Sequence, residues 1–353
     1  MESHMIENSD LIKLPELPVI ELVDDPVQVY KEFMVIRAAL QIGLFDWMNK
    51  AGRSTIEEIS AGTGIAKEYI SAFMAMLFYL DIVRRSDDVY YLSPSASLHF
   101  VTSSNYYQGD IIVSLGSESS PWYDLHTFLT NPDEKNIFNQ KDTLVTAADA
   151  EREMRGMIKN VTTVISRWAG FKEAKSFLEI GRGHGLYAIA LCQIHPSIKA
   201  TVVSTPESEK LLSENIKKYG MEERIKEVQK IPSPNEGTYD IVLASNSLYD
   251  PDRNGKTISE CLSEMESAIN ENGLFVSNHW FNHPPQGTGM QGLYELELAL
   301  HNRYHTIQSQ EEFEESCAAN HLSIFQTGVM RSMYGESIIH MATKKQNSKG
   351  EAL

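Results

Sequence analysis

A glycine-rich loop between a short apolar strand and an apolar helix limits the possible folds more strongly than any other part of the sequence. The strand is predicted over Ser176–Ile180, the loop is Gly181-Arg-Gly183-His-Gly185, and the helix follows over Leu186–His195. Glycines let the backbone approach a ligand closely, and the start of a helix offers free N–H groups. The last glycine interval is one residue shorter than in the dinucleotide pattern Gly-x-Gly-x-x-Gly, which argues against a dehydrogenase. We expect a nucleotide-type binding loop, with a ligand-free glycine turn as the alternative.

Strands and helices alternate from this loop onward. Further strands are expected over Ala200–Val203, Asp240–Ala244 and Gly273–Ser277, and a strand pair, Ile324–Val329 and Glu336–Ala342, closes the sheet. Repeated strand–helix units form parallel sheets with right-handed crossovers. The predicted fold class is therefore α/β, with a doubly wound, mostly parallel sheet. The remaining helices are expected over Pro206–Tyr219 with Thr205 as its cap, over Thr257–Asn270 and over Gln310–Asn320.

The N-terminal half is mainly helical and carries one hairpin. Helical periodicity covers Ala38–Met48 and ends near Gly52, Ser54–Glu58 has the pattern of a capping box, and a strongly apolar helix covers Ala66–Leu80. Residues 82–92 have the pattern of strand, turn and strand, an order typical of a winged helix. The helix over 66–80 contains one lysine and a wide apolar surface, which favours dimerisation over DNA binding.

The length of 353 residues favours two domains. A long amphipathic helix over Ala147–Trp168 is expected to bridge the two halves. The resulting divisions are a flexible N-terminus over 1–20, a winged-helix-like dimerisation domain over 21–105, linking helices over 106–170, the α/β domain over 171–345 and a flexible tail over 346–353.

Charge and cysteine usage exclude several classes of partner. The formal net charge is −17 and no concentrated basic patch occurs, so we expect no nucleic-acid partner. The N-terminus lacks the pattern of a secretory signal, and no apolar run is long enough to cross a bilayer. Cys192, Cys261 and Cys317 lie far apart without metal-type spacing, which favours buried thiols in a reducing cytosol. We expect a cytoplasmic protein without a metal or a membrane partner.

Motifs in a specific order run along nearly the whole chain. They are Ala39–Asp46, Ser54–Ile59 and Tyr91–Ser93 in the N-terminal half, Phe177–Gly185 and Tyr239–Asp250 in the core, and Asn302–Thr306 near the end. In this order they resemble the S-adenosylmethionine-dependent O-methyltransferases of the caffeic acid and hydroxyindole type. The resemblance implies an N-terminal winged-helix dimerisation domain, a class I methyltransferase domain, a homodimer, a small-molecule substrate and S-adenosyl-L-methionine as cofactor.

Three positions depart from that family's pattern. Relatives end the second strand of the domain with an acid that holds the ribose hydroxyls, and this chain has Ser204 there. After the third strand relatives carry Gly-Asp, and this chain has Lys230 or Ile231. Tyr249 replaces the histidine base, and an ordinary tyrosine pKa of about 10 makes it a poor base near neutral pH. Tyr249 is therefore expected to position the substrate or to pack.

Candidate site residues follow from the loop, the strand ends and the resemblance. For catalysis we expect Tyr249, Asp250 and His279. His279 or His283 could serve as a substitute base that Asp250 orients, and an ordinary hydrogen-bonded loop histidine is the alternative for each. Arg182 is expected to pair with Glu179 or to reach a ligand carboxylate. The expected cofactor contacts are Glu179, Gly181, Gly183, Gly185, Ser204, Lys230, Ser245 and Asn246, and the expected substrate pocket contains Trp122, Tyr123, Trp280, Met290, Tyr294 and Met333.

The sequence therefore favours an S-adenosylmethionine-dependent methyltransferase of secondary metabolism, acting on a hydroxyl or other nucleophile of an aromatic or apolar metabolite. Because the usual base and acids are missing, a related enzyme that has lost methyl transfer and catalyses a rearrangement or cyclisation is the second hypothesis. A non-catalytic binding or regulatory dimer is the third.

Overall fold

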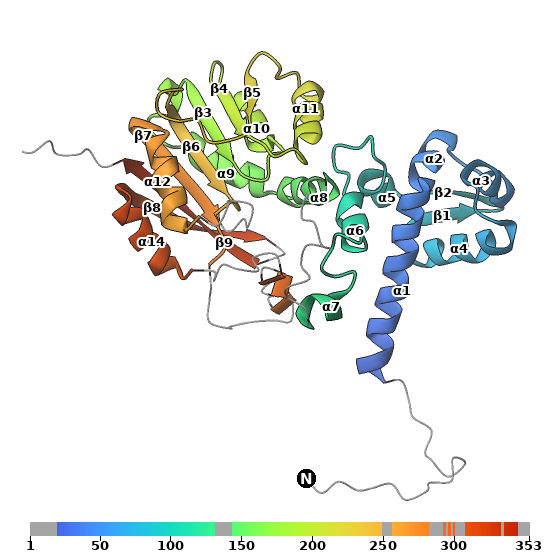
Figure 1. The fold of residues 1–353 in the computed structure, drawn as a ribbon. Helices are drawn as coiled ribbons and strands as arrows, with labels where there is room; N and C mark the ends of the chain where they lie inside the picture. Colours follow the sequence, from blue (N-terminus) through green and yellow to red (C-terminus); the bar gives the residue numbers. More distant parts are fainter. Residues whose placement is uncertain are drawn as a thin grey trace, which may run out of the picture. The chain divides into compact units, whose positions relative to one another are not determined.

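The computed structural model describes residues 20–130, 143–248, 256–281, 308–332 and 335–344, together with six helical residues between 292 and 300. The chain divides into two compact units, Met1–Asn105 and Tyr106–Leu353 (Figure 1). We refer to them as unit 1 and unit 2 and describe each by itself.

Unit 1 consists of helices and one hairpin. The predicted single helix ending near Gly52 is wrong, because Gly43 takes a left-handed conformation (φ +75°) and divides it into two helices. The predicted capping box is confirmed: Thr55 accepts from the Glu58 N–H, and Glu58 accepts from the Thr55 N–H. The predicted hairpin is also confirmed as an antiparallel strand pair. The elements are α1 (Glu21–Ile42), α2 (Leu44–Ala51), α3 (Ile56–Thr63), α4 (Lys67–Tyr79), β1 (Val83–Ser86), β2 (Val89–Leu92) and α5 (Pro94–His99).

The first part of unit 2 is helical and precedes the sheet. The continuous helix expected over Ala147–Trp168 is broken at Gly156, whose φ of +137° no other residue adopts easily. A glycine in a helical pattern can end the helix, and here it ends one and begins the next. The elements are α6 (Gly109–Leu115), α7 (Leu125–Thr130), α8 (Thr143–Met154), α9 (Met157–Ser166) and the 3₁₀ helix η3 (Phe171–Glu173).

A seven-stranded sheet forms the centre of unit 2, in the order β5-β4-β3-β6-β7-β9-β8. The first five strands in this order are parallel, and β9 pairs antiparallel with both β7 and β8. The predicted doubly wound α/β class is therefore confirmed. The strands are β3 (Ser176–Ile180), β4 (Lys199–Val203), β5 (Ile225–Val228), β6 (Tyr239–Ser245), β7 (Ile269–His279), β8 (Leu322–Ser332) and β9 (Gly335–Lys344), and the helices between them are α10 (Leu186–Ile194), α11 (Glu209–Lys218), α12 (Ile258–Ser267) and α14 (Gln310–Ala319).

Two predicted helix boundaries are wrong. Helix α11 begins at Glu209 rather than at Pro206, and its N-cap is Ser208 rather than Thr205. The Ser208 hydroxyl instead accepts from the Thr205 N–H at 2.9 Å, so the three residues before the helix form a turn. Helix α12 ends at Ser267, and β7 begins at Ile269, four residues before the expected start of that strand.

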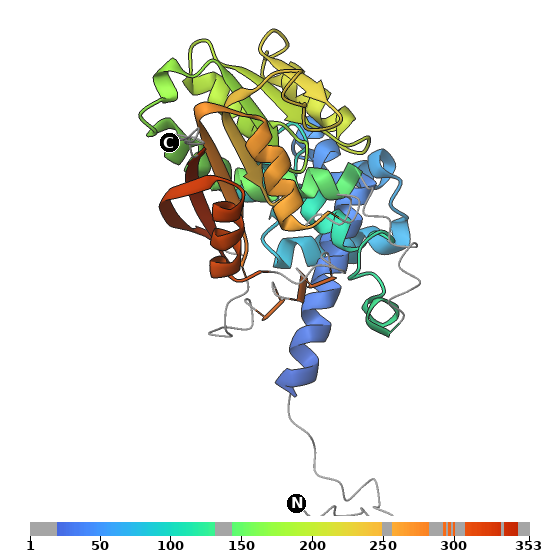
Figure 2. The same ribbon diagram turned by 60° about the vertical axis from the view of Figure 1, so that its left-hand side comes forward.

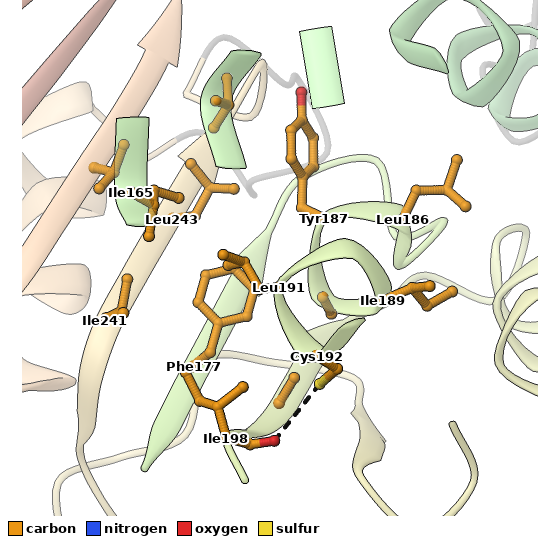
Figure 3. Close-up of a cluster of buried hydrophobic side chains, with 14 of the residues drawn as sticks. Ile165, Phe177, Leu186, Tyr187, Ile189, Leu191, Cys192, Ile198, Ile241 and Leu243 are labelled. Carbon is orange, nitrogen blue, oxygen red and sulfur yellow. Dashed lines mark hydrogen bonds between the residues drawn. The ribbon is translucent and has the colours of Figure 1, made fainter. Parts of the chain in front are cut away.

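Helices cover both faces of the sheet (Figures 1 and 2). On one face the buried side chains come from α9, α10 and α11, and on the other from α12 and α14. Figure 3 shows the first of these clusters, which includes Phe177 of β3 and Leu191 and Cys192 of α10. Tyr187 belongs to the same cluster, but its hydroxyl points away from the apolar side chains (Figure 3). This orientation sends a polar group toward the end of the strands where the glycine loop lies.

All three cysteines are free and buried, on α10, α12 and α14. Among the described residues, no helix is both long and apolar enough to span a lipid bilayer.

Candidate functional site

The glycine loop leads from β3 into α10, and its backbone requires glycine at two positions. Gly183 and Gly185 have φ of +77° and +74°, which favour glycine. A Cβ on Gly183 would lie 2.3 Å from the Ser208 Oγ, and a Cβ on Gly185 would lie 2.3 Å from the Leu212 Cδ1. Close packing against α11 and the turn before it therefore excludes a larger side chain at both Gly183 and Gly185. A Cβ on Gly181 would lie 3.2 Å from the Ser245 carbonyl oxygen of β6.

Glu179, the penultimate residue of β3, caps the helix that follows the loop. Its side chain is 1% exposed, and its Oε2 accepts from the Ala188 N–H of α10 at 2.7 Å. The N-cap residue of α10 is Gly185, which has no side chain to accept a hydrogen bond from the first N–H groups of the helix. Within the described residues the Oε1 atom is buried without a hydrogen-bond partner. Burial raises the pKa of Glu179 to about 7, because the backbone hydrogen bonds and nearby His184 only partly offset the loss of hydration.

His184, inside the loop, is held by a carboxylate that the sequence analysis missed. Its Nε2 lies 2.8 Å from the Glu153 Oε2 of α8, and its Nδ1 accepts from the Leu186 N–H at 3.2 Å. The Nδ1 lone pair is thus in use, which places the ring proton on Nε2, where it is donated to Glu153. Burial disfavours the charged ring, but the nearby carboxylates of Glu153, Glu179 and Asp149 together outweigh burial and raise the pKa of His184.

Glu153 connects the loop to two neighbouring elements. Its Oε1 accepts from the Asn246 side chain at 3.3 Å, and its charge adds to burial in raising the pKa of the Tyr187 hydroxyl. It is 8% exposed and lies three residues after Ala150 and four before Met157, on the buried side of its helical segment. An acid at an apolar position of a helix was the available signal, because charged groups are rarely buried without partners.

The end of β6 contributes polar groups to the same region. The Ser245 hydroxyl lies 3.3 Å from the Tyr187 hydroxyl and accepts from the Asn278 side chain at 3.4 Å. Asn246 has a φ of +49°, which is uncommon for a residue other than glycine. Its Oδ1 is buried without a hydrogen-bond partner within the described residues. The structure therefore brings the predicted residues Glu179, Ser245 and Asn246 together around Glu153 and Tyr187.

Ser204 follows β4, beside the loop. It is 2% exposed, and its hydroxyl donates to the carboxylate of Glu227 on β5. The Gln229 side chain donates to both groups, at 3.3 Å to each. Lys230, the other predicted cofactor contact in this region, is exposed to solvent.

The predicted roles of three other residues are not supported. His279 is fully buried, and its Nε2 already accepts from the N–H groups of Ser247 and Leu248, at 3.1 Å each, so that lone pair cannot take a substrate proton. Arg182 pairs with Asp149 of α8 at 3.4 Å rather than with Glu179. Tyr123 is 57% exposed, which does not suit the lining of a pocket.

Trp122 packs against a small apolar cluster with Phe128 and Leu300, and Trp280 is half-buried directly after β7. The remaining candidates lie outside the described residues, namely Tyr249, Asp250, His283, Met290, Tyr294 and Met333.

Comparison with known proteins finds two relatives by sequence. No family model matches the sequence. The chain is 25% identical over 285 residues to an uncharacterized protein of Methanocaldococcus jannaschii, covering 78% of this chain and 73% of that protein. It is 24% identical over 248 residues to the 3-hydroxy-5-methyl-1-naphthoate 3-O-methyltransferase of Streptomyces sahachiroi, covering 66% of this chain and 70% of that enzyme.

Solved structures match over more than nine tenths of the chain. An O-methyltransferase family protein from Burkholderia thailandensis superposes with a TM-score of 0.72 at 16% identity, covering 94% of this chain and all of the other. The chain has the O-methyltransferase fold. Human N-acetylserotonin methyltransferase, solved with S-adenosylmethionine, has a TM-score of 0.68 at 17% identity, covering 94% of this chain and 99% of that one. The resemblance that the sequence motifs carried is thereby confirmed for an O-methyltransferase fold that extends over both units.

Proposed function

We propose that the chain is an S-adenosylmethionine-dependent methyltransferase that acts on a hydroxyl or other nucleophile of an aromatic or apolar small molecule. The observation that carries this proposal is the charge beside the glycine loop. Two buried carboxylates, Glu179 and Glu153, lie there, and the Oε1 of Glu179 has no hydrogen-bond partner among the described residues. A dinucleotide would bring a negatively charged pyrophosphate against these groups. S-adenosylmethionine brings an ammonium and a sulfonium, which such groups attract.

The residues present fit this cofactor. Backbone N–H groups of the loop can face the ligand, and the carboxylate of Glu179 can accept from its ammonium group. A bound cation favours the ionised form of Glu179, whose pKa of about 7 leaves it partly protonated near neutral pH. The cofactor supplies an already activated methyl group, so the chain's own contribution is to hold both reactants and exclude water. The aromatic substrate class is supported by the named substrate of the Streptomyces relative, a hydroxynaphthoate.

Titration calorimetry with S-adenosylhomocysteine, the demethylated cofactor, tests the proposal directly. We expect binding to the purified chain, and a loss of roughly 10- to 100-fold in affinity in Glu179→Gln, because one charge-assisted hydrogen bond contributes about 1.5–3 kcal/mol. Glu173→Gln in η3 is the matched control and is expected to bind like the native chain. Absence of binding at millimolar ligand would overturn the proposal.

A second measurement separates methyl transfer from related chemistry. The chain is incubated with S-adenosylmethionine and a panel of hydroxylated aromatic acids, and mass spectrometry follows both products. Formation of S-adenosylhomocysteine together with a product heavier by one methylene is expected. A substrate that is consumed without gain of a methyl group would favour the enzyme that has lost methyl transfer.

We also propose that the chain is a cytoplasmic protein. We further propose that two copies of it form a homodimer through unit 1. Helix α4 exposes aromatic side chains, with Tyr69 71% and Tyr79 78% exposed, and α1 exposes Leu22 and Tyr30. Exposed apolar patches of this kind mark interfaces more often than solvated surfaces. Light scattering after gel filtration is expected to give twice the monomer mass, and Tyr69→Glu with Tyr79→Glu is expected to shift the protein toward monomer. A native chain that elutes as a monomer at all concentrations would refute this.

A further inference from the structure

Glu227 of β5 places a carboxylate at the ends of β4 and β5, beside the glycine loop. Strands β4 and β5 run parallel, with Val203 opposite Val228, so both end at the edge of the sheet where β3 leads into the loop. Glu227 is the penultimate residue of β5 and is half-buried. In doubly wound sheets ligands bind beyond this edge.

The carboxylate of Glu227 is held in place from one side. Its Oε1 accepts from the Ser204 hydroxyl and from the Gln229 amide, the latter at 3.3 Å. Within the described part of the chain, Oε2 has no hydrogen-bond partner and no basic side chain forms an ion pair with this group. Two neutral donors thus position a carboxylate whose second oxygen makes no hydrogen bond within the described residues.

Ser204 brings this carboxylate next to the loop. A Cβ on Gly183 would lie 3.2 Å from the Ser204 Cα, so the loop backbone passes close to Ser204. In dinucleotide-binding domains of this architecture, an acid about 20 residues after the glycine loop accepts from a ribose hydroxyl. Ser204 has about that spacing from the loop, and it cannot accept two charge-assisted hydrogen bonds. Glu227 brings a carboxylate to that place from the neighbouring strand.

We propose that Glu227, positioned by Ser204 and Gln229, accepts hydrogen bonds from the ribose hydroxyls of the adenosyl ligand. This inference rests on the proposed function. It assigns to the chain a ribose contact that the sequence alone places on Ser204, and it explains how the site functions without an acid at the end of β4. A purely structural role for Glu227, joining the ends of two strands, would give no dependence on the ribose hydroxyls.

The experiment pairs protein variants with ligand variants. Titration calorimetry measures binding of S-adenosylhomocysteine and of its 2′,3′-dideoxy analogue to the native chain, to Glu227→Gln and to Glu223→Gln, an exposed acid before the same strand. We expect Glu227→Gln to weaken S-adenosylhomocysteine binding by roughly 10- to 100-fold and to leave binding of the dideoxy analogue unchanged. Glu223→Gln is expected to change neither.

The possible outcomes are distinct. Equal weakening of both ligands, or no weakening in Glu227→Gln while the native chain binds tightly, overturns the role of Glu227 and leaves the proposed function intact. Absence of binding by the native chain overturns the proposed function and this inference with it. Thermal unfolding of each variant checks that it is folded, and Ser204→Ala, which removes one positioning donor, is expected to give a smaller loss confined to the hydroxylated ligand.

Discussion

Replacing Gly185 by alanine tests whether packing against α11, rather than a ligand, demands glycine at the end of the loop. The φ of +74° is unfavourable for any residue with a Cβ, and the new Cβ would lie 2.3 Å from the Leu212 Cδ1. The left-handed backbone costs roughly 1–2 kcal/mol. Overpacking of a buried site costs roughly a further 1–3 kcal/mol. We therefore expect Gly185→Ala to lower the free energy of unfolding of unit 2 by roughly 2–5 kcal/mol.

A glycine elsewhere in unit 2 separates the two contributions. Gly220 also has a positive φ, +64°, and an added Cβ there would meet nothing within 4 Å. Gly220→Ala should therefore show the backbone contribution alone, roughly 1–2 kcal/mol. Leu212→Ala removes the obstacle itself, so the penalty of Gly185→Ala in that background should fall to the same value.

Urea unfolding followed by tryptophan fluorescence measures these differences. In a Trp47→Phe background the three remaining tryptophans, Trp122, Trp168 and Trp280, all belong to unit 2, so the signal reports on that unit. Should Gly185→Ala be no more destabilising than Gly220→Ala, or should the Leu212→Ala background leave its penalty unchanged, the packing argument is wrong.

Two further predictions concern buried titratable groups. Glu151 of α8 accepts from the N–H groups of Asp110 and Ile111, and burial, followed by repulsion from Asp110, raises its pKa to about 8. The folded state then keeps a proton that the unfolded chain loses near the ordinary pKa of 4.5, so stability should fall between about pH 4.5 and pH 8, by at most about 1.4 kcal/mol per pH unit. In thermal unfolding across this range, Glu151→Gln should show a shallower fall of stability with pH than the native chain. An identical dependence on pH would contradict the assignment. The three thiols are buried, and burial raises the pKa of Cys317 to about 12. A thiol reagent such as dithionitrobenzoate should therefore modify none of them until the chain unfolds. Rapid reaction of any one of them in the native protein would show that the helix carrying that cysteine separates from the core.

Most strands were predictable because local pattern decides them, although β5 was not predicted and β7 begins four residues before its expected start. Ser176–Ile180 has three apolar residues, Phe177, Leu178 and Ile180, directly before the glycine loop, and the strand has the predicted bounds. Helix ends at Gly43 and Gly156 were harder to predict, since each glycine lies inside a helical pattern that continues on both sides. A glycine in a helix reduces its stability by only about 1 kcal/mol, so periodicity alone favours continuation. The tertiary packing on either side decides whether the chain turns at that point.

The candidate site was partly predictable. The loop glycines, Ser245 and Asn246 stand next to strand ends, and strand ends can be read from sequence. Glu153 and Glu227 could not be assigned in this way, because the first contacts the loop across a helix packing interface and the second reaches Ser204 from another strand. His279 was proposed as a base from its position alone, whereas its protonation chemistry depends on which backbone N–H groups its ring accepts from.

The strand order at one edge of the sheet has a consequence for biosynthesis. Strand β9 is the last element that the structure describes, yet it lies between β7 and β8 and is the only strand that pairs with β8 among the described residues. The nascent chain can therefore attach β8 to the sheet only after residues 335–344 have left the ribosome. A stop codon just before β9 would delete one strand from the gene product and detach a second, so truncated chains should be substrates for proteolysis rather than partly active proteins.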